Sequence, residues 1–109
     1  MDGATLQLDD GPALIGIGEL RAGEPARATI APDAVSLHRT PPGGSPRNSF
    51  EARVVSLDSR GPVVGVSVAI AGQTVRADLT AAAVTELGIV PGATVFAVVK
   101  ATQVTLHRM

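Results

Sequence analysis

The strongest constraint on the fold of this chain is a period-two alternation of apolar residues in its second half. Apolar residues occupy every second position in residues 64–70 and 75–79, and residues 49–57 follow the same pattern. Such alternation is typical of strands with one buried face. Turn-forming residues separate these stretches at 58–62 and 71–73. The sequence therefore predicts three consecutive strands that are joined by tight turns.

The period-two alternation of apolar residues is replaced by a helical pattern once, between Thr80 and Gly88. Thr80 is a favourable N-cap residue, three alanines follow it, and Gly88 stands where a helix often ends. This pattern predicts a helix of about two turns, which packing must stabilise because it is short. Two further strands are expected at 94–100 and 103–107. Three strands, a short helix and two strands is the order of an OB-type barrel, so we expect a mainly all-β fold with an OB-like barrel over residues 45–109.

Shorter extended segments precede this barrel. Strands are expected at 4–8, 13–17, 26–30 and 36–39, with turn residues between them. The segment Pro32-Asp33-Ala34 is predicted to form a tight turn or a single helical turn. We therefore expect residues 1–40 to form an N-terminal layer of strands within one compact unit.

The composition narrows the possible functions. The chain has 109 residues, a formal net charge of −1, two aromatic residues and no cysteine. A nucleic-acid-binding surface normally shows a basic excess and stacking aromatics, so this class is disfavoured. Without cysteine, disulfides and thiolate metal sites are excluded. No apolar run is long enough to span a membrane. The N-terminus also lacks the basic segment followed by an apolar segment that is typical of a signal peptide, so a soluble cytoplasmic protein is expected.

The sequence contains no identifiable catalytic or metal-binding set. His38 and His107 each precede an arginine, and neither is accompanied by a cluster of carboxylates. No serine is marked as an activated nucleophile. A phosphate-binding Gly-x-x-x-x-Gly-Lys-Ser/Thr loop is also absent. We therefore expect a binding domain rather than an enzyme, and no cofactor.

A polar motif, Ser45-Pro46-Arg47-Asn48, separates a loop rich in proline and glycine from the first strand of the barrel. It resembles the opening motif of the Mop-like molybdate-binding domains, known more broadly as TOBE domains. Three further landmarks of that family follow in order, at Leu79-Thr80, residues 87–92 and residues 99–102. Residues 30–35 also resemble the segment that precedes this domain in ATPase subunits of ABC importers. The resemblance implies the C-terminal accessory domain of a molybdate-importer ATPase, without its nucleotide-binding domain.

The same resemblance implies a site for molybdate or tungstate between two copies of the chain. It assigns Ser45, Arg47 and Asn48 to one copy, and Thr80, Lys100 and the backbone of Ala101 and Thr102 to the other. A tetrahedral dianion accepts hydrogen bonds and donates none, so a guanidinium, an ammonium group and hydroxyls suit it. The start of the predicted helix also presents backbone N–H groups that favour an anion.

One position of the implied site departs from the family pattern, and Ala31 stands where the segment before the domain usually has arginine. A second serine is common three residues after the threonine, where this chain has Ala83. Losing one hydrogen bond to a charged ligand costs about 1.5–3 kcal/mol, or roughly one to two decades of affinity. Structural alternatives also stay open for Arg47 as a surface ion-pair partner, for Asn48 as a residue that bonds loop backbone, and for Lys100 as a side chain that reaches solvent.

Together these expectations describe a cytoplasmic regulatory and dimerisation domain of a molybdate ABC transporter, peripheral to the inner face of the cell membrane. Its partners would be further copies of itself, in a homodimer or a larger even assembly, an ATPase domain of the same subunit and, through that domain, a membrane permease. The alternative is a structural domain that dimerises importer ATPases without a ligand. A nucleic-acid binder and a free molybdate-storage protein are weaker hypotheses, and residues 1–40 argue against storage because the free forms need only the barrel.

Overall fold

Nine strands, one α-helix and two short 3-10 turns make up the part of the chain that the structure describes. The structure is a computed structural model, and it describes residues 3–8, 12–42 and 48–109. The strands are β1 Gly3–Gln7, β2 Ala13–Ile17, β3 Ala26–Ile30, β4 Ser36–His38, β5 Asn48–Arg60, β6 Val63–Ile70, β7 Gln73–Thr80, β8 Thr94–Val99 and β9 Val104–Arg108. The helix α1 spans Ala81–Leu87, and the 3-10 turns are η1 Pro32–Ala34 and η2 Ala101–Gln103.

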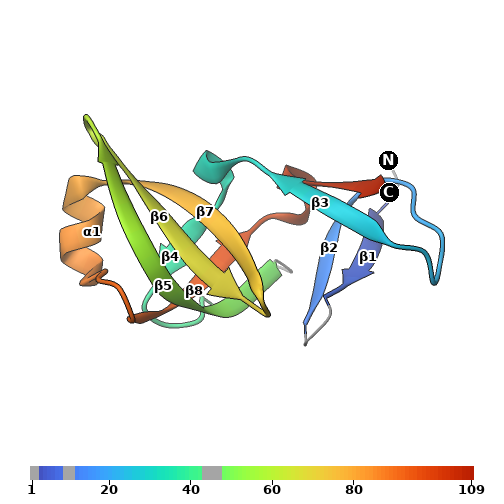
Figure 1. Cartoon of the computed structure of the whole chain (residues 1–109), viewed down its shortest axis with the longest axis horizontal. Coiled ribbons are helices and arrows are strands. Elements are labelled where there is room, and N and C mark those ends of the chain that lie inside the picture. Colours follow the sequence, from blue (N-terminus) through green and yellow to red (C-terminus); the bar gives the residue numbers. More distant parts are fainter. Residues whose placement is uncertain (1–2, 9–11, 43–47) are drawn as a thin grey trace.

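The strands form two sheets (Figure 1). The barrel sheet is antiparallel and has the order β4-β8-β5-β6-β7. The terminal sheet has the order β1-β2-β9-β3 and lies beside both ends of the chain. The barrel sheet curls, and α1 lies at its end away from the terminal sheet (Figure 1). The predicted mainly all-β fold with one short helix is confirmed, and the nine strands lie within a few residues of their predicted positions.

The sheets do not divide the chain at the boundary that the sequence suggested. β4 lies within residues 1–40 but pairs with β8 of the barrel sheet, whereas β9 lies within residues 45–109 but pairs with β3 and β2. Val104 and Leu106 of β9 are buried as a result. Residues 1–40 are therefore not a self-contained layer, because each sheet takes one strand from the other half of the chain.

β5 is longer than the alternation predicted. It continues through residues 58–60, where the composition indicated a turn. Asp58 pairs with Gly65 of β6, and Arg60 pairs with Val63 at the start of the same strand. Strand pairing therefore holds this segment extended and leaves only two residues for the turn between β5 and β6.

The helix α1 has the predicted cap at each end. Thr80 Oγ1 accepts a hydrogen bond from the Ala83 amide at 3.1 Å, which satisfies one of the unpaired N–H groups of the first turn. Gly88 has a φ of 64° and ends the helix in the left-handed conformation. The half-buried Val84 and Leu87 pack against the core, so the predicted buried side of the helix is confirmed.

The core is built mainly from aliphatic side chains. Its least exposed large members are Val54, Val66, Val68, Val95 and Val104, each less than 2% exposed. These residues come from three strands of the barrel sheet and from β9. One core therefore spans both sheets, and each buried side chain of this size contributes about 1.5–3 kcal/mol to it.

Candidate functional site

The residues that the sequence assigned to a ligand site do not gather in one place. Ser45 and Arg47 lie outside the described residues. The others are Asn48 at the start of β5, Thr80 at the end of β7, Lys100 directly after β8, and Ala101 and Thr102 in η2.

Lys100 lies beside Asn48 at one end of the barrel sheet. Val99, the residue before it, pairs with Asn48 in the register of β5 and β8. Lys100 then begins η2, because its carbonyl accepts the Gln103 amide at 2.9 Å. Its side chain is exposed, and no carboxylate of the described residues lies within ion-pairing distance of it. The positive charge of Lys100 is therefore available to a ligand.

A polar pocket of about 360 Å³ has Lys100 on its wall. The other lining residues are Asp33 and Ala34 of η1, Ser36 of β4, Val98 of β8 and Gln103 of η2. The pocket is thus formed where the chain passes from one sheet to the other. The ammonium group and the Gln103 carboxamide can donate hydrogen bonds to an anion, whereas the Asp33 carboxylate opposes one.

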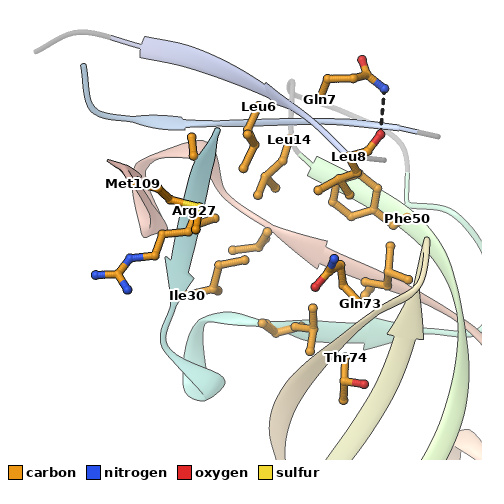
Figure 2. A pocket seen from close by; sticks show the side chains of 17 residues that line it. Leu6, Gln7, Leu8, Leu14, Arg27, Ile30, Phe50, Gln73, Thr74 and Met109 are labelled. Carbon is orange, nitrogen blue, oxygen red and sulfur yellow. Dashed lines mark hydrogen bonds between the residues drawn. The ribbon is translucent and has the colours of Figure 1, made fainter. Parts of the chain in front are cut away.

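A larger cavity of about 460 Å³ opens between the two sheets (Figure 2). The side chains of Leu6, Leu14, Ile30 and Phe50 surround it, and most of its lining is aliphatic (Figure 2). Such walls cannot replace the hydration of a dianion, and burying a charge without partners is costly. The polar pocket is therefore the better candidate for an oxyanion.

Thr80 lies at the opposite end of the barrel sheet from Lys100. It pairs with Val63, which pairs in turn with Arg60 at the last position of β5. Lys100 lies just beyond Asn48, at the first position of the same 13-residue strand. At about 3.3 Å per residue, the ends of such a strand are on the order of tens of ångströms apart. The strand register therefore separates Thr80 from Lys100 within one copy and argues against the implied grouping of both residues on the same copy.

Asn48 is a buried polar side chain, with 4% of its surface exposed. Its carboxamide oxygen accepts the Ile15 amide at 2.7 Å, and its nitrogen donates to the Ile15 carbonyl at 2.7 Å. The side chain thus joins β5 to β2 of the terminal sheet, and a direct ligand role for it stays a prediction. The structural alternative given above predicted that Asn48 hydrogen-bonds the backbone of a loop, whereas its partner is the backbone of a strand. No local pattern could identify Ile15, which is 33 residues away.

The comparison with known families decides what kind of domain this is. The TOBE domain family matches residues 44–106, which is more than half of the chain. The chain belongs to the TOBE domain family. The resemblance seen in the sequence is confirmed, and the matched region of the TOBE domain includes every predicted site residue.

Relatives of this TOBE domain include import ATP-binding proteins. It is 38% identical over 94 residues to the molybdenum import ATP-binding protein ModC from two strains of Mycobacterium tuberculosis, covering 84% of this chain and 26% of ModC. It is 36% identical over 70 residues to the molybdate/tungstate import ATP-binding protein WtpC of Pyrococcus abyssi, covering 64% of this chain and 20% of WtpC. The chain thus spans about a quarter of the length of ModC.

A solved structure shares the fold of this TOBE domain. The cytoplasmic molybdate-binding protein ModG, crystallised with molybdate bound, superimposes with a TM-score of 0.88 and is 26% identical in sequence. The match covers 98% of this chain and 84% of the ModG chain. It therefore includes the terminal sheet as well as the barrel sheet, and the predicted OB-like fold is confirmed.

A TOBE domain is a binding domain rather than a catalytic one. Within the described part of the TOBE chain, no three His, Cys, Asp or Glu side chains are grouped as the ligands of a metal ion would be. No helix of the described residues is long and apolar enough to cross a bilayer.

Proposed function

We propose that this TOBE domain binds molybdate or tungstate in the polar pocket that Lys100 lines. The observation that best supports this function is an ammonium group without an ion-pair partner among the described residues, placed at the start of η2. The first N–H groups of a helical turn have no partner inside the turn, so the backbone of Ala101 and Thr102 adds donors. Hydrogen bonds between a cation and an oxyanion are shorter and stronger than those between neutral groups.

A second copy of the chain completes the proposed site. Since Thr80 and Lys100 lie at opposite ends of one barrel sheet, the Thr80 hydroxyl that reaches the anion comes from the neighbouring copy. Thr80 Oγ1 accepts the Ala83 amide, which leaves its own O–H group available to donate. Ser45 and Arg47 shortly precede β5, so we assign them to the copy that supplies Lys100. A homodimer with twofold symmetry then holds two equivalent sites.

Ala83 determines the strength of binding that we expect. It uses its backbone amide for the Thr80 cap, and its side chain carries no hydroxyl group. A site with serine at this position would have one more donor. The missing hydrogen bond lowers affinity by roughly one to two decades relative to such a site.

We infer that the domain regulates transport as part of an import ATP-binding subunit. This inference is supported by the similarity to ModC and WtpC, although the chain spans only about a quarter of ModC. Its partners are then the ATPase domain of the same subunit and, through it, a membrane permease at the cytoplasmic face. The anion regulates such an assembly only if it binds one arrangement of the two copies more tightly than another.

Isothermal titration calorimetry with molybdate, tungstate and sulfate tests the binding function. We expect heat of binding with molybdate and tungstate, and its loss in Lys100→Gln. Arg108→Gln is the matched control, because Arg108 is an exposed cation at the last position of β9, away from Lys100 and Thr80, and its guanidinium lies 3.9 Å from the Glu24 carboxylate. Absence of binding heat with all three anions would remove the proposed function.

A ligand-free dimerisation domain is the second candidate, and Ala83 favours it. This function predicts a dimer whose mass does not depend on molybdate and which Arg47→Ala leaves intact. Size-exclusion chromatography with light scattering, with and without molybdate, distinguishes the two functions. A molybdate-dependent shift in the dimerisation constant supports the binding domain, because linkage requires the ligand to strengthen the arrangement that it bridges.

A further inference from the structure

Two connections join the sheets, and both lie within the described residues. β3 leads through η1 into β4, and β8 leads through η2 into β9 (Figure 1). Asp33 and Ala34 of η1 line the polar pocket together with Lys100 and Gln103 of the η2 connection. The geometry of this pocket therefore depends on how the two sheets are placed relative to each other.

Asn48 links the two sheets by hydrogen bonds beside the polar pocket. Its carboxamide occupies both backbone polar groups of Ile15, each at 2.7 Å, and Asn48 itself pairs with the residue that precedes Lys100. β2 is joined to β9 by a single registered pair, Ile17 with Thr105. The two hydrogen bonds to Ile15 therefore hold a part of β2 that is not paired with β9.

β2 also packs directly on η2. A Cβ atom at Gly16 would approach the carbonyl oxygen and a side-chain methyl group of Val104 to 2.8 Å each, closer than real Cβ contacts. The backbone of β2 thus forms a close wall behind the residue that ends η2. A displacement of β2 would alter this contact and, with it, the turn that Lys100 begins.

We propose that Asn48 is a positioning residue for the oxyanion site. By holding β2 against η2, it fixes Lys100 and the backbone donors of η2 in the geometry that the anion requires, and it needs no contact with the anion. This role rests on the proposed function, since it describes how the same site is held. By linkage, a bound anion stabilises the contact between β2 and η2 in return.

Hydrogen exchange of the full chain without ligand, measured by mass spectrometry, tests whether Asn48 holds η2. We expect Asn48→Ala to exchange about tenfold faster than wild type in peptides covering residues 13–17 and 100–104. Val66→Ala is the control, because Val66 is buried in the middle of β6 and lies at neither end of the barrel sheet. Asn48→Ser, which keeps one polar group, provides a milder variant should the alanine variant fail to fold. Faster exchange confined to residues 13–17 would overturn the proposal.

Titration of the same variants with molybdate tests the consequence for binding. We expect Asn48→Ala to bind about tenfold more weakly than the Val66→Ala control, with Asn48→Ser between them. Molybdate should slow exchange at residues 13–17 in wild type but not in Asn48→Ala. Equal affinity of Asn48→Ala and the control would refute the positioning role. If wild type binds no molybdate, the proposed function fails, and the exchange without ligand still decides whether Asn48 positions η2.

Discussion

At the scale of single residues, Thr80 has a role in folding that can be separated from its proposed role in binding. Its Oγ1 accepts the Ala83 amide at 3.1 Å. Thr80→Ala should lower the free energy of unfolding by about 1 kcal/mol, whereas Thr80→Ser should keep the cap. Urea denaturation of the unliganded protein measures both changes. Equal stability of Thr80→Ala and wild type would show that the cap does not contribute.

Asp33 opposes the anion that Lys100 attracts. Both residues line the polar pocket, and the carboxylate of Asp33 carries the same sign of charge as molybdate. Asp33→Asn should therefore raise the affinity for molybdate severalfold, with the larger gain at low ionic strength. Glu24→Gln is the control, because Glu24 is an exposed carboxylate that pairs with Arg108 at the far end of β9, away from Lys100 and Thr80. Calorimetry at two salt concentrations measures the change, and an unchanged or weaker affinity would place Asp33 away from the bound anion.

At the scale of elements, the hairpin between β6 and β7 contains an unfavourable residue. Ala71 and Gly72 connect these strands, with φ of 48° and 79°. Positive φ at both positions is typical of a type I′ turn, in which Asn-Gly is strongly preferred. Ala71→Asn should therefore stabilise the protein, by up to about 1 kcal/mol. Thermal unfolding measures the gain. Gly72→Ala is the control and should destabilise, and a lower melting temperature for Ala71→Asn would contradict this turn geometry.

Elements whose signals are local were predictable from the sequence. The limits of α1 were predictable because the residues that set them, the N-cap Thr80 and the left-handed Gly88, are adjacent to the helix in the sequence. The end of β5 was not predictable, because residues 58–60 have the composition of a turn. They stay extended through contacts with other strands, including the Asp58 carboxylate near Arg76 of β7 at 3.9 Å.

At the scale of the whole molecule, the sequence predicted the strands but not their assignment to sheets. β4 belongs to the barrel sheet, whose other strands come from the second half of the chain, and β9 belongs to the terminal sheet, whose other strands come from the first half. The sequence did not predict this assignment because the pairing partners of both strands are distant in sequence. The same limitation affected the site. The sequence identified Lys100 and Thr80 as candidate ligands, but only the strand register showed that they lie at opposite ends of the barrel sheet.

The central claim is that one anion is bound by Lys100 of one copy and Thr80 of another. Complementation between two defective variants tests it most directly. Lys100→Gln and Thr80→Ala should each bind molybdate weakly, and coexpression of the two should restore tight binding at about a quarter of all sites. About half of the dimers are then mixed, and one of the two sites in each mixed dimer carries both wild-type residues. Equilibrium dialysis with molybdate measures this fraction. A coexpressed sample that binds no better than either variant alone would contradict the shared site.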